Sequence, residues 1–125
     1  MANYIDGFVF PIPCDGLEIY LQVVEKVAEI WREHGALSYS EFLDDDAGMP
    51  GLPVFSDLIQ AKEGEVIVFG WVEFESKEMR NVVNEKVASD TRMESLLAPI
   101  MSGPKTVFDA SRMVWGGFRP LVHSS

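Results

Sequence analysis

The segment that most constrains this chain is VIVFGWVEFE, from Val66 to Glu75, because it is apolar on both of its sides. Successive side chains of an extended strand point to opposite faces, so Val68 and Val72 share one face while Phe69 and Trp71 share the other. An antiparallel strand that met water on one face would alternate apolar and polar residues. The segment therefore predicts a strand that is covered on both faces.

The first and last strands that the sequence predicts repeat this pattern. In the segment from Tyr4 to Ile12, Phe8 opposes Val9, and two prolines follow. In the segment from Arg112 to Val122, Trp115 opposes Val114 and Phe118. The sheet as a whole is thus expected to be apolar on both faces.

Two longer helices separate these strands. Apolar residues recur at helical spacing from Leu17 to Trp31, after a possible cap at Asp15 and before a stop at Gly35. Ser76 can cap a second helix that runs to about Ala88. A shorter helical piece is expected from residue 90 to near residue 99.

Together with a less apolar strand at residues 36–43, these elements give the order βαββαβ. That order predicts a single α+β domain over residues 1–125 with a ferredoxin-like fold: a four-stranded antiparallel sheet with helices on one face. Residues 44–53 are expected to form an acidic, exposed loop, and residues 54–62 either a short helix or an irregular edge segment.

Helices on one face leave the other apolar face of the sheet bare, and no remaining segment is expected to cover it. An apolar patch of that size is unusual on a monomer. A second copy that presents the same face would cover it with a symmetric interface. The sequence therefore predicts an obligate homodimer.

Charge and cysteine content limit the partners and the compartment. Twenty acidic against ten scattered basic residues give a net charge of −10, which disfavours nucleic acid and anionic membrane surfaces. The single cysteine, Cys14, allows no internal disulfide and favours a reducing compartment. The beginning of the chain has no signal-peptide pattern, and no apolar run is long enough to span a bilayer. We expect a cytoplasmic protein.

Several separate blocks resemble one family. YIDGFVFPIP, EHGAL, VIVFGWVEFESKEMRNVVNEKVASDTRM and RMVWGGF together resemble the YbaA-like family of conserved bacterial proteins, over all but the acidic loop and the C-terminal tail. The resemblance implies a dimeric α+β barrel, in which two ferredoxin-like units pair sheet to sheet. It supplies no catalytic motif. The wider superfamily includes cofactor-free oxygenases, haem-degrading enzymes, lactone isomerases and ligand-sensing domains, so the fold does not fix the function.

Carboxylates on the sheet faces are the candidate catalytic residues. Asp6 shares a strand face with aromatic residues, Glu73 lies beside Trp71 on the same face, and Glu41 beside Tyr39. A desolvated carboxylate can titrate near neutral pH, as a general base requires. The alternative is that these acids pair with Arg112 or Arg119, or are solvated.

A substrate pocket between sheet and helices would have Tyr39, Trp71 and Trp115 as its walls and Asp6 or Glu73 as its base. Asn84 is a further candidate, because it borders the apolar stripe of the second helix. Such a pocket suits a cofactor-independent oxygenase or isomerase acting on a flat organic molecule. The alternative is a non-catalytic ligand-binding or structural module.

No metal or cofactor is expected. The sequence has no phosphate-binding glycine loop, no dinucleotide fingerprint and no paired-cysteine pattern. His34 and His123 are too far apart in the chain to indicate a metal or haem site, and His34 suits the C-terminal end of a helix, where a cation is favoured. The run from Asp44 to Asp46 could attract a divalent cation, but a solvated loop is the simpler interpretation.

Overall fold

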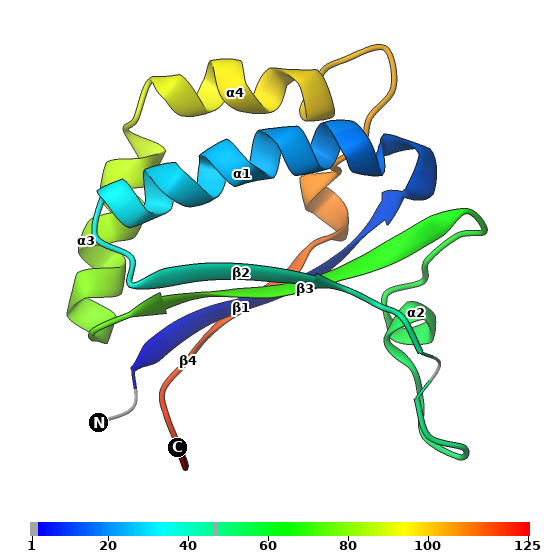
Figure 1. Cartoon of the computed structure of the whole chain (residues 1–125), viewed down its shortest axis with the longest axis horizontal. Coiled ribbons are helices and arrows are strands. Elements are labelled where there is room, and N and C mark those ends of the chain that lie inside the picture. Colours follow the sequence, from blue (N-terminus) through cyan, green and yellow to red (C-terminus); the bar gives the residue numbers. More distant parts are fainter. Residues whose placement is uncertain (1–2, 47) are drawn as a thin grey trace.

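The structure is a computed structural model, and it describes residues 3–46 and 48–125. Its four strands and four helices follow the expected order, with α2 as an addition between the second and third strands (Figure 1). The strands are β1 (Tyr4–Pro13), β2 (Ser38–Leu43), β3 (Glu65–Phe74) and β4 (Val114–Phe118). The helices are α1 (Leu17–Glu33), α2 (Phe55–Leu58), α3 (Lys77–Ala88) and α4 (Arg92–Met101), with short 3₁₀ turns at Cys14–Gly16 and Ala110–Arg112.

The strands form one antiparallel sheet in the order β2-β3-β1-β4. Helices α1, α3 and α4 all lie on one side of it (Figure 1). This is the ferredoxin-like arrangement that the sequence predicted. The last strand is shorter than expected and spans 114–118 instead of 112–122. Its partner residues on β1 run only from Ile5 to Val9, and Pro120 has no N–H with which to extend the ladder.

Helix α1 packs its apolar stripe onto the sheet because Tyr20, Val23, Val27 and Ile30 recur on one face and are all buried. The helix ends as the sequence indicated. His34 is the C-cap, and Gly35 follows with φ +123°, a backbone conformation that L side chains rarely adopt.

Helices α3 and α4 have different neighbours. Ser76 caps α3 by accepting a hydrogen bond from the Met79 N–H, and Val83 and Val87 are buried beneath the helix. Helix α4 lies above α1, on the side away from the sheet, instead of resting on the strands (Figure 1).

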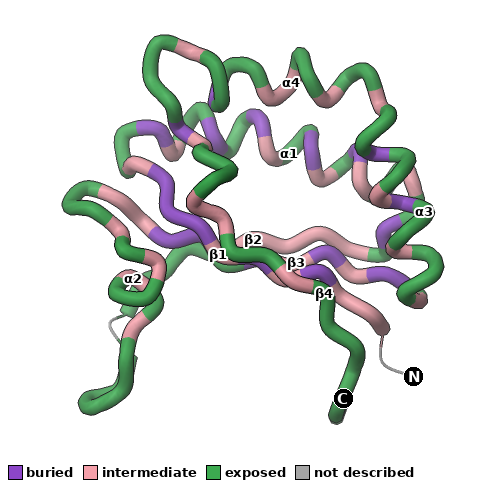
Figure 2. Tube along the Cα trace, turned by 180° about the vertical axis from the view of Figure 1, so that it is seen from behind, coloured by how far each residue is buried: buried purple, intermediate pink, exposed green. Residues whose placement is uncertain are grey.

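The core lies between the sheet and the helices. Its most buried members are Ile12, Phe74 and Val83, each 0% exposed, and buried residues follow the middle strands and the inner side of α1 (Figure 2). The edge strand β4 is largely exposed (Figure 2).

The other face of the sheet is apolar and largely open, as expected. One row of paired positions crosses all four strands on this face: Phe42, Phe69, Val9 and Val114. Phe42 is 56% exposed and Val114 is 59% exposed. We call this surface the outer sheet face.

One expectation about the outer sheet face was wrong, because part of the chain does cover it. The excursion between β2 and β3, which carries α2, extends past this face (Figure 1). Phe55 of α2 packs edge-on against Phe69 with ring centres 5.6 Å apart. Ile67, on the same face of β3, is only 2% exposed. The segment 54–62 thus contains the short helix α2, which covers one end of the face and leaves the rest bare.

Candidate functional site

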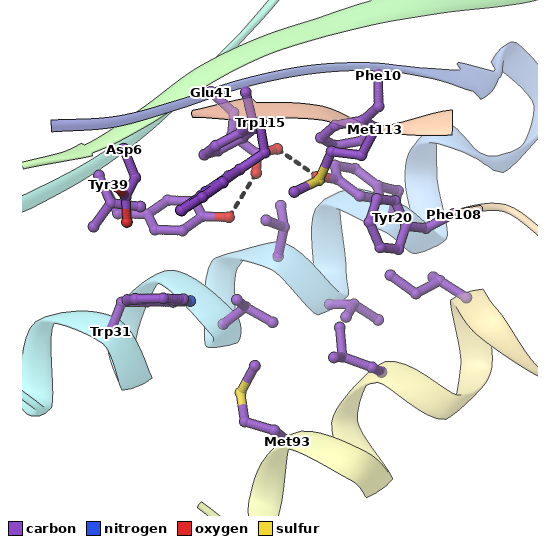
Figure 3. A pocket seen from close by; sticks show the side chains of 17 residues that line it. Asp6, Phe10, Tyr20, Trp31, Tyr39, Glu41, Met93, Phe108, Met113 and Trp115 are labelled. Atoms are coloured by element: carbon purple, nitrogen blue, oxygen red, sulfur yellow. Dashed lines mark hydrogen bonds between the residues drawn. The ribbon is translucent and has the colours of Figure 1, made fainter. Parts of the chain in front are cut away.

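A cavity of about 220 Å³ lies between the sheet and the helices. Side chains of all four strands and of α1 and α4 enclose it, and most of its surface is apolar (Figure 3). Six of its aromatic walls are Phe8, Phe10, Tyr20, Trp31, Tyr39 and Trp115. Trp115 of the edge strand β4 lines the cavity and is 49% exposed.

Glu41 is one of two carboxylates in this wall, and two tyrosines hold it. The Tyr20 hydroxyl donates to its Oε1 at 2.5 Å, and the Tyr39 hydroxyl donates to its Oε2 at 2.7 Å (Figure 3). Burial raises the pKa of Glu41, and the two hydroxyl bonds oppose that shift. Burial and the neighbouring carboxylate both raise the pKa of each tyrosine, so the two phenols stay protonated donors.

Asp6 is the second carboxylate, and its side chain is only 3% exposed. Arg80 Nη1 lies 3.3 Å from its Oδ1, and Asn84 Nδ2 lies 3.4 Å from its Oδ2. Burial raises the pKa of Asp6, while the charge of Arg80 and the bond from Asn84 lower it by less. Both polar contacts are long, so Asp6 keeps acceptor capacity for another donor.

Arg80 is fixed over the edge of the sheet. Its Nη2 donates to the Tyr4 hydroxyl at 3.1 Å, and its guanidinium lies 5.0 Å from the Tyr4 ring centre and 5.7 Å from that of Trp115. Arg80 Nε and Asn84 Oδ1 are buried without a hydrogen-bond partner among the described residues.

Four of the seven residues that the sequence indicated as candidates line the cavity: Asp6, Tyr39, Glu41 and Trp115. Asn84 stands behind them and contacts Asp6. The structure therefore brings together five of the seven.

The expectation that Trp71 and Glu73 face the same cavity was wrong. Both lie on the outer sheet face, where Trp71 stacks on Phe42 at 5.3 Å. Glu73 accepts hydrogen bonds from Asn3 Nδ2 at 2.9 Å and from the Ser38 hydroxyl at 3.0 Å. The physical reason is strand alternation, since residues 71 and 73 point away from Val72, whose side chain faces the helices.

Two members of the site, Tyr20 and Arg80, were not among the candidates that the sequence indicated. Tyr20 falls within the apolar stripe of α1, where it has the spacing of a core residue. A signal did exist for Arg80, because it precedes Asn84 by four residues and so shares its helix face. Glu41 was noted beside Tyr39, but the second tyrosine comes from another element and could not be read from spacing.

Among residues 3–46 and 48–125, no three His, Cys, Asp or Glu side chains gather in a way that could hold a metal ion. His34, at the end of α1, instead contacts Asp90, with its Nε2 2.7 Å from Oδ2. No helix of the described chain is both long and apolar enough to cross a membrane.

A family model described as a protein of unknown function (DUF1428) matches residues 3–109. The chain belongs to the DUF1428 family. Consistent with this, it is 35% identical over 120 residues to the uncharacterized protein YbaA of Escherichia coli K12, and the match covers 96% of this chain and 97% of the relative. The uncharacterized protein YbaA of Shigella flexneri matches equally well. The resemblance read from the sequence blocks is thereby confirmed.

Solved structures share the fold of this DUF1428 protein. The crystal structure of a nipsnap family protein of unknown function from Agrobacterium tumefaciens superposes with a TM-score of 0.59 at 19% identity, covering 98% of this chain and 92% of that one. A second crystal structure of the same Agrobacterium tumefaciens protein gives a TM-score of 0.57 at 17% identity, covering 94% of this chain and 93% of that one. At this identity the likeness shows a shared fold and carries no activity across.

Proposed function

We propose that the cavity binds a small, flat organic molecule and that the protein is an enzyme that moves a proton on it, in the manner of an isomerase or a cofactor-independent oxygenase. One observation carries this proposal: two carboxylates of raised pKa, Asp6 and Glu41, line an otherwise apolar cavity of about 220 Å³. Buried acids with raised pKa values in a pocket are typical of catalytic sites.

Size limits the substrate class. An apolar cavity of about 150 Å³ is enough for benzene. The cavity here is somewhat larger, so it suits a single ring with one or two substituents. Aromatic walls at Trp31, Tyr39 and Trp115 suit a flat ring, because stacked and edge-to-face contacts favour it.

Asp6 is the better general base of the two carboxylates. Each oxygen of Glu41 already accepts a short hydrogen bond from a tyrosine, whereas the contacts of Asp6 are long. In an isomerisation, Asp6 would remove a proton from one carbon atom of the substrate and return it at another. No oxidant or second substrate is consumed. Asn84 and Arg80 would hold the carboxylate in place.

Hydrogen–deuterium exchange tests this role without knowledge of the natural substrate. The protein is incubated in D₂O with ring-sized ketones such as cyclohexenone, and deuterium at carbon is followed by NMR. We expect exchange above the buffer rate in the wild type and its loss in Asp6→Asn with ketone binding retained. The matched control is Glu73→Gln, which removes a carboxylate from the outer sheet face and should leave exchange unchanged.

The same experiment separates the second candidate function, a non-catalytic ligand-binding module. Binding of ketones with no exchange in the wild type would support that module and refute the enzyme. The apolar lining is the observation that favours it, because a ligand sensor needs walls but no base.

We further propose that two copies pair through the outer sheet face, and that the protein acts in the cytoplasm. Exposed apolar residues of β2, β3 and β4 on that face, Phe42, Phe69, Val114 and Phe118, support the pairing. A free and exposed Cys14 supports a reducing compartment.

A further inference from the structure

We infer that the ligand of the cavity carries a positively charged group, an organic ammonium, which Glu41 and the surrounding rings recognise. This inference rests on the proposed function of the cavity and names the chemical class of its substrate.

The charged groups of the cavity lining are acids. Apart from tyrosines, the ionisable residues of the wall are Asp6 and Glu41. Asp6 has the guanidinium of Arg80 beside it. Among the described residues, the hydrogen-bond partners of the Glu41 carboxylate are the two neutral tyrosine hydroxyls, and no ion pair includes it. The cavity therefore lacks the cation that an ionised Glu41 would call for.

The Glu41 carboxylate and the two tyrosine hydroxyls keep free hydrogen-bond acceptor positions. A carboxylate offers about four lone-pair positions, and the tyrosines use one on each oxygen. Each phenol oxygen also keeps a lone pair, since its proton points to Glu41. An ammonium group has three donors and no acceptor, so it fits a site that offers only acceptors.

Aromatic rings form much of the cavity wall. Trp31 lies across the cavity from the sheet, and Trp115 lies beside the two tyrosines (Figure 3). The ring centres of Trp31 and Tyr39 are 6.5 Å apart. Aromatic faces attract cations through their quadrupoles, most strongly where water is excluded. A bound cation would thus interact with the same walls that hold the ring of the substrate.

The strands β3 and β1 provide the positions next to Glu41 in the sheet. Glu41 pairs with Gly70 on β3, and Gly70 pairs with Phe8 on β1. A side chain at residue 70 would collide with the Phe8 ring, whose nearest atom would be 2.7 Å from the added Cβ. Glycine at residue 70 therefore allows the Phe8 ring, which lines the cavity, to pack close to the strand next to Glu41. An anionic ligand in the cavity would meet the two acids of its wall, which disfavours it on charge.

Three probes of the same size and different charge test the inference: benzylamine, benzyl alcohol and benzoate. Binding is followed by NMR on the tryptophan indole N–H signals at pH 7. Trp31 and Trp115 report from the cavity wall, and Trp71 on the outer sheet face is the internal reference. We expect benzylamine to shift only the two cavity signals and to bind about tenfold tighter than benzyl alcohol. Benzoate should not bind.

Glu41→Gln is the matched variant, since it keeps the shape and removes the charge. It should abolish the preference for benzylamine over benzyl alcohol. If benzyl alcohol binds at the cavity as well as benzylamine does in the wild type, the inference is wrong and the proposed cavity function stands. If none of the three probes shifts Trp31 or Trp115, both proposals are refuted. The wild-type comparison decides the matter even if the variant does not fold.

Discussion

Val114→Glu should break the pairing of two copies through the outer sheet face. Val114 ends the apolar row that crosses the sheet and is 59% exposed in the single chain. In the monomer a glutamate at this exposed position meets water and should cost little. In a sheet-to-sheet dimer the same change would desolvate two like charges, which costs several kcal/mol.

The magnitude can be worked from the exposed aromatic residues of that face. Phe42 and Phe118 are each 56% exposed, and Phe69 is 41% exposed. A phenylalanine buries about 200 Å² in full, so these three leave roughly 300 Å² of apolar surface open on each copy. Covering both copies would contribute about 15 kcal/mol, against an association cost of about 4–15 kcal/mol. The net margin is small enough for one charge per copy to raise the dimer dissociation constant by about a hundredfold or more.

Sedimentation velocity over a concentration series measures this directly. The wild type should sediment near 28 kDa at micromolar concentration, twice the 14.0 kDa of one chain, and Val114→Glu near the single-chain mass. The control is Val82→Glu, the same substitution on α3 at a valine that is 44% exposed and away from the sheet. A wild type that sediments as a monomer, or a Val114→Glu protein as dimeric as the control, would refute the reasoning.

Three further predictions concern stability. Because burial raises the pKa of Glu41 in the folded state, the stability of the wild type should fall as pH rises from the ordinary value of 4.5 through that raised pKa. Glu41→Gln removes this pH-dependent loss of stability. In urea unfolding, the free energy of unfolding of the variant minus that of the wild type should therefore be larger at pH 8 than at pH 4. The same difference at both pH values would contradict the raised pKa of Glu41. Gly70→Ala should lower the free energy of unfolding by about 1–3 kcal/mol, because its Cβ would lie 2.5 Å from the Ser40 carbonyl oxygen and 2.7 Å from the Phe8 ring. An unchanged free energy of unfolding would show that the strands shift to make room for the methyl group. Bonds from Arg112 lower the pKa of Glu65 from 4.5 to about 2, so that carboxylate stabilises the fold above pH 4.5 and ceases to do so as pH falls through 2. Glu65→Gln should therefore destabilise more at pH 7 than at pH 2, and a constant difference would argue against the ion pair.

Much of the fold could be predicted because its signals are local. Alternation along the strands identified both apolar faces of the sheet, and helical spacing identified the stripe of α1 with Tyr20, Val24 and Val27. The cover that α2 provides over Phe69 could not be predicted. A four-residue helix has too few positions to show a period, and its packing depends on a contact between distant segments.

The site was predicted less completely because it depends on which faces and strands meet. Alternation already placed Trp71 and Glu73 opposite Val72, but the side that the helices cover is a tertiary feature. The pairing of Glu41 with both Tyr20 and Tyr39 needs the crossing of α1 over β2, which no spacing reveals. Asp6, Tyr39 and Trp115 were found because each lies on a strand whose own pattern is clear.

The central claim is that the space between the sheet and the helices is a ligand site. A crystal structure of the wild-type protein grown with benzylamine tests it most directly. We predict electron density for the ring between Trp31 and Trp115, with the nitrogen within hydrogen-bond distance of the Glu41 carboxylate. A cavity closed by its own side chains, or an amine bound only on the outer sheet face, would contradict the claim.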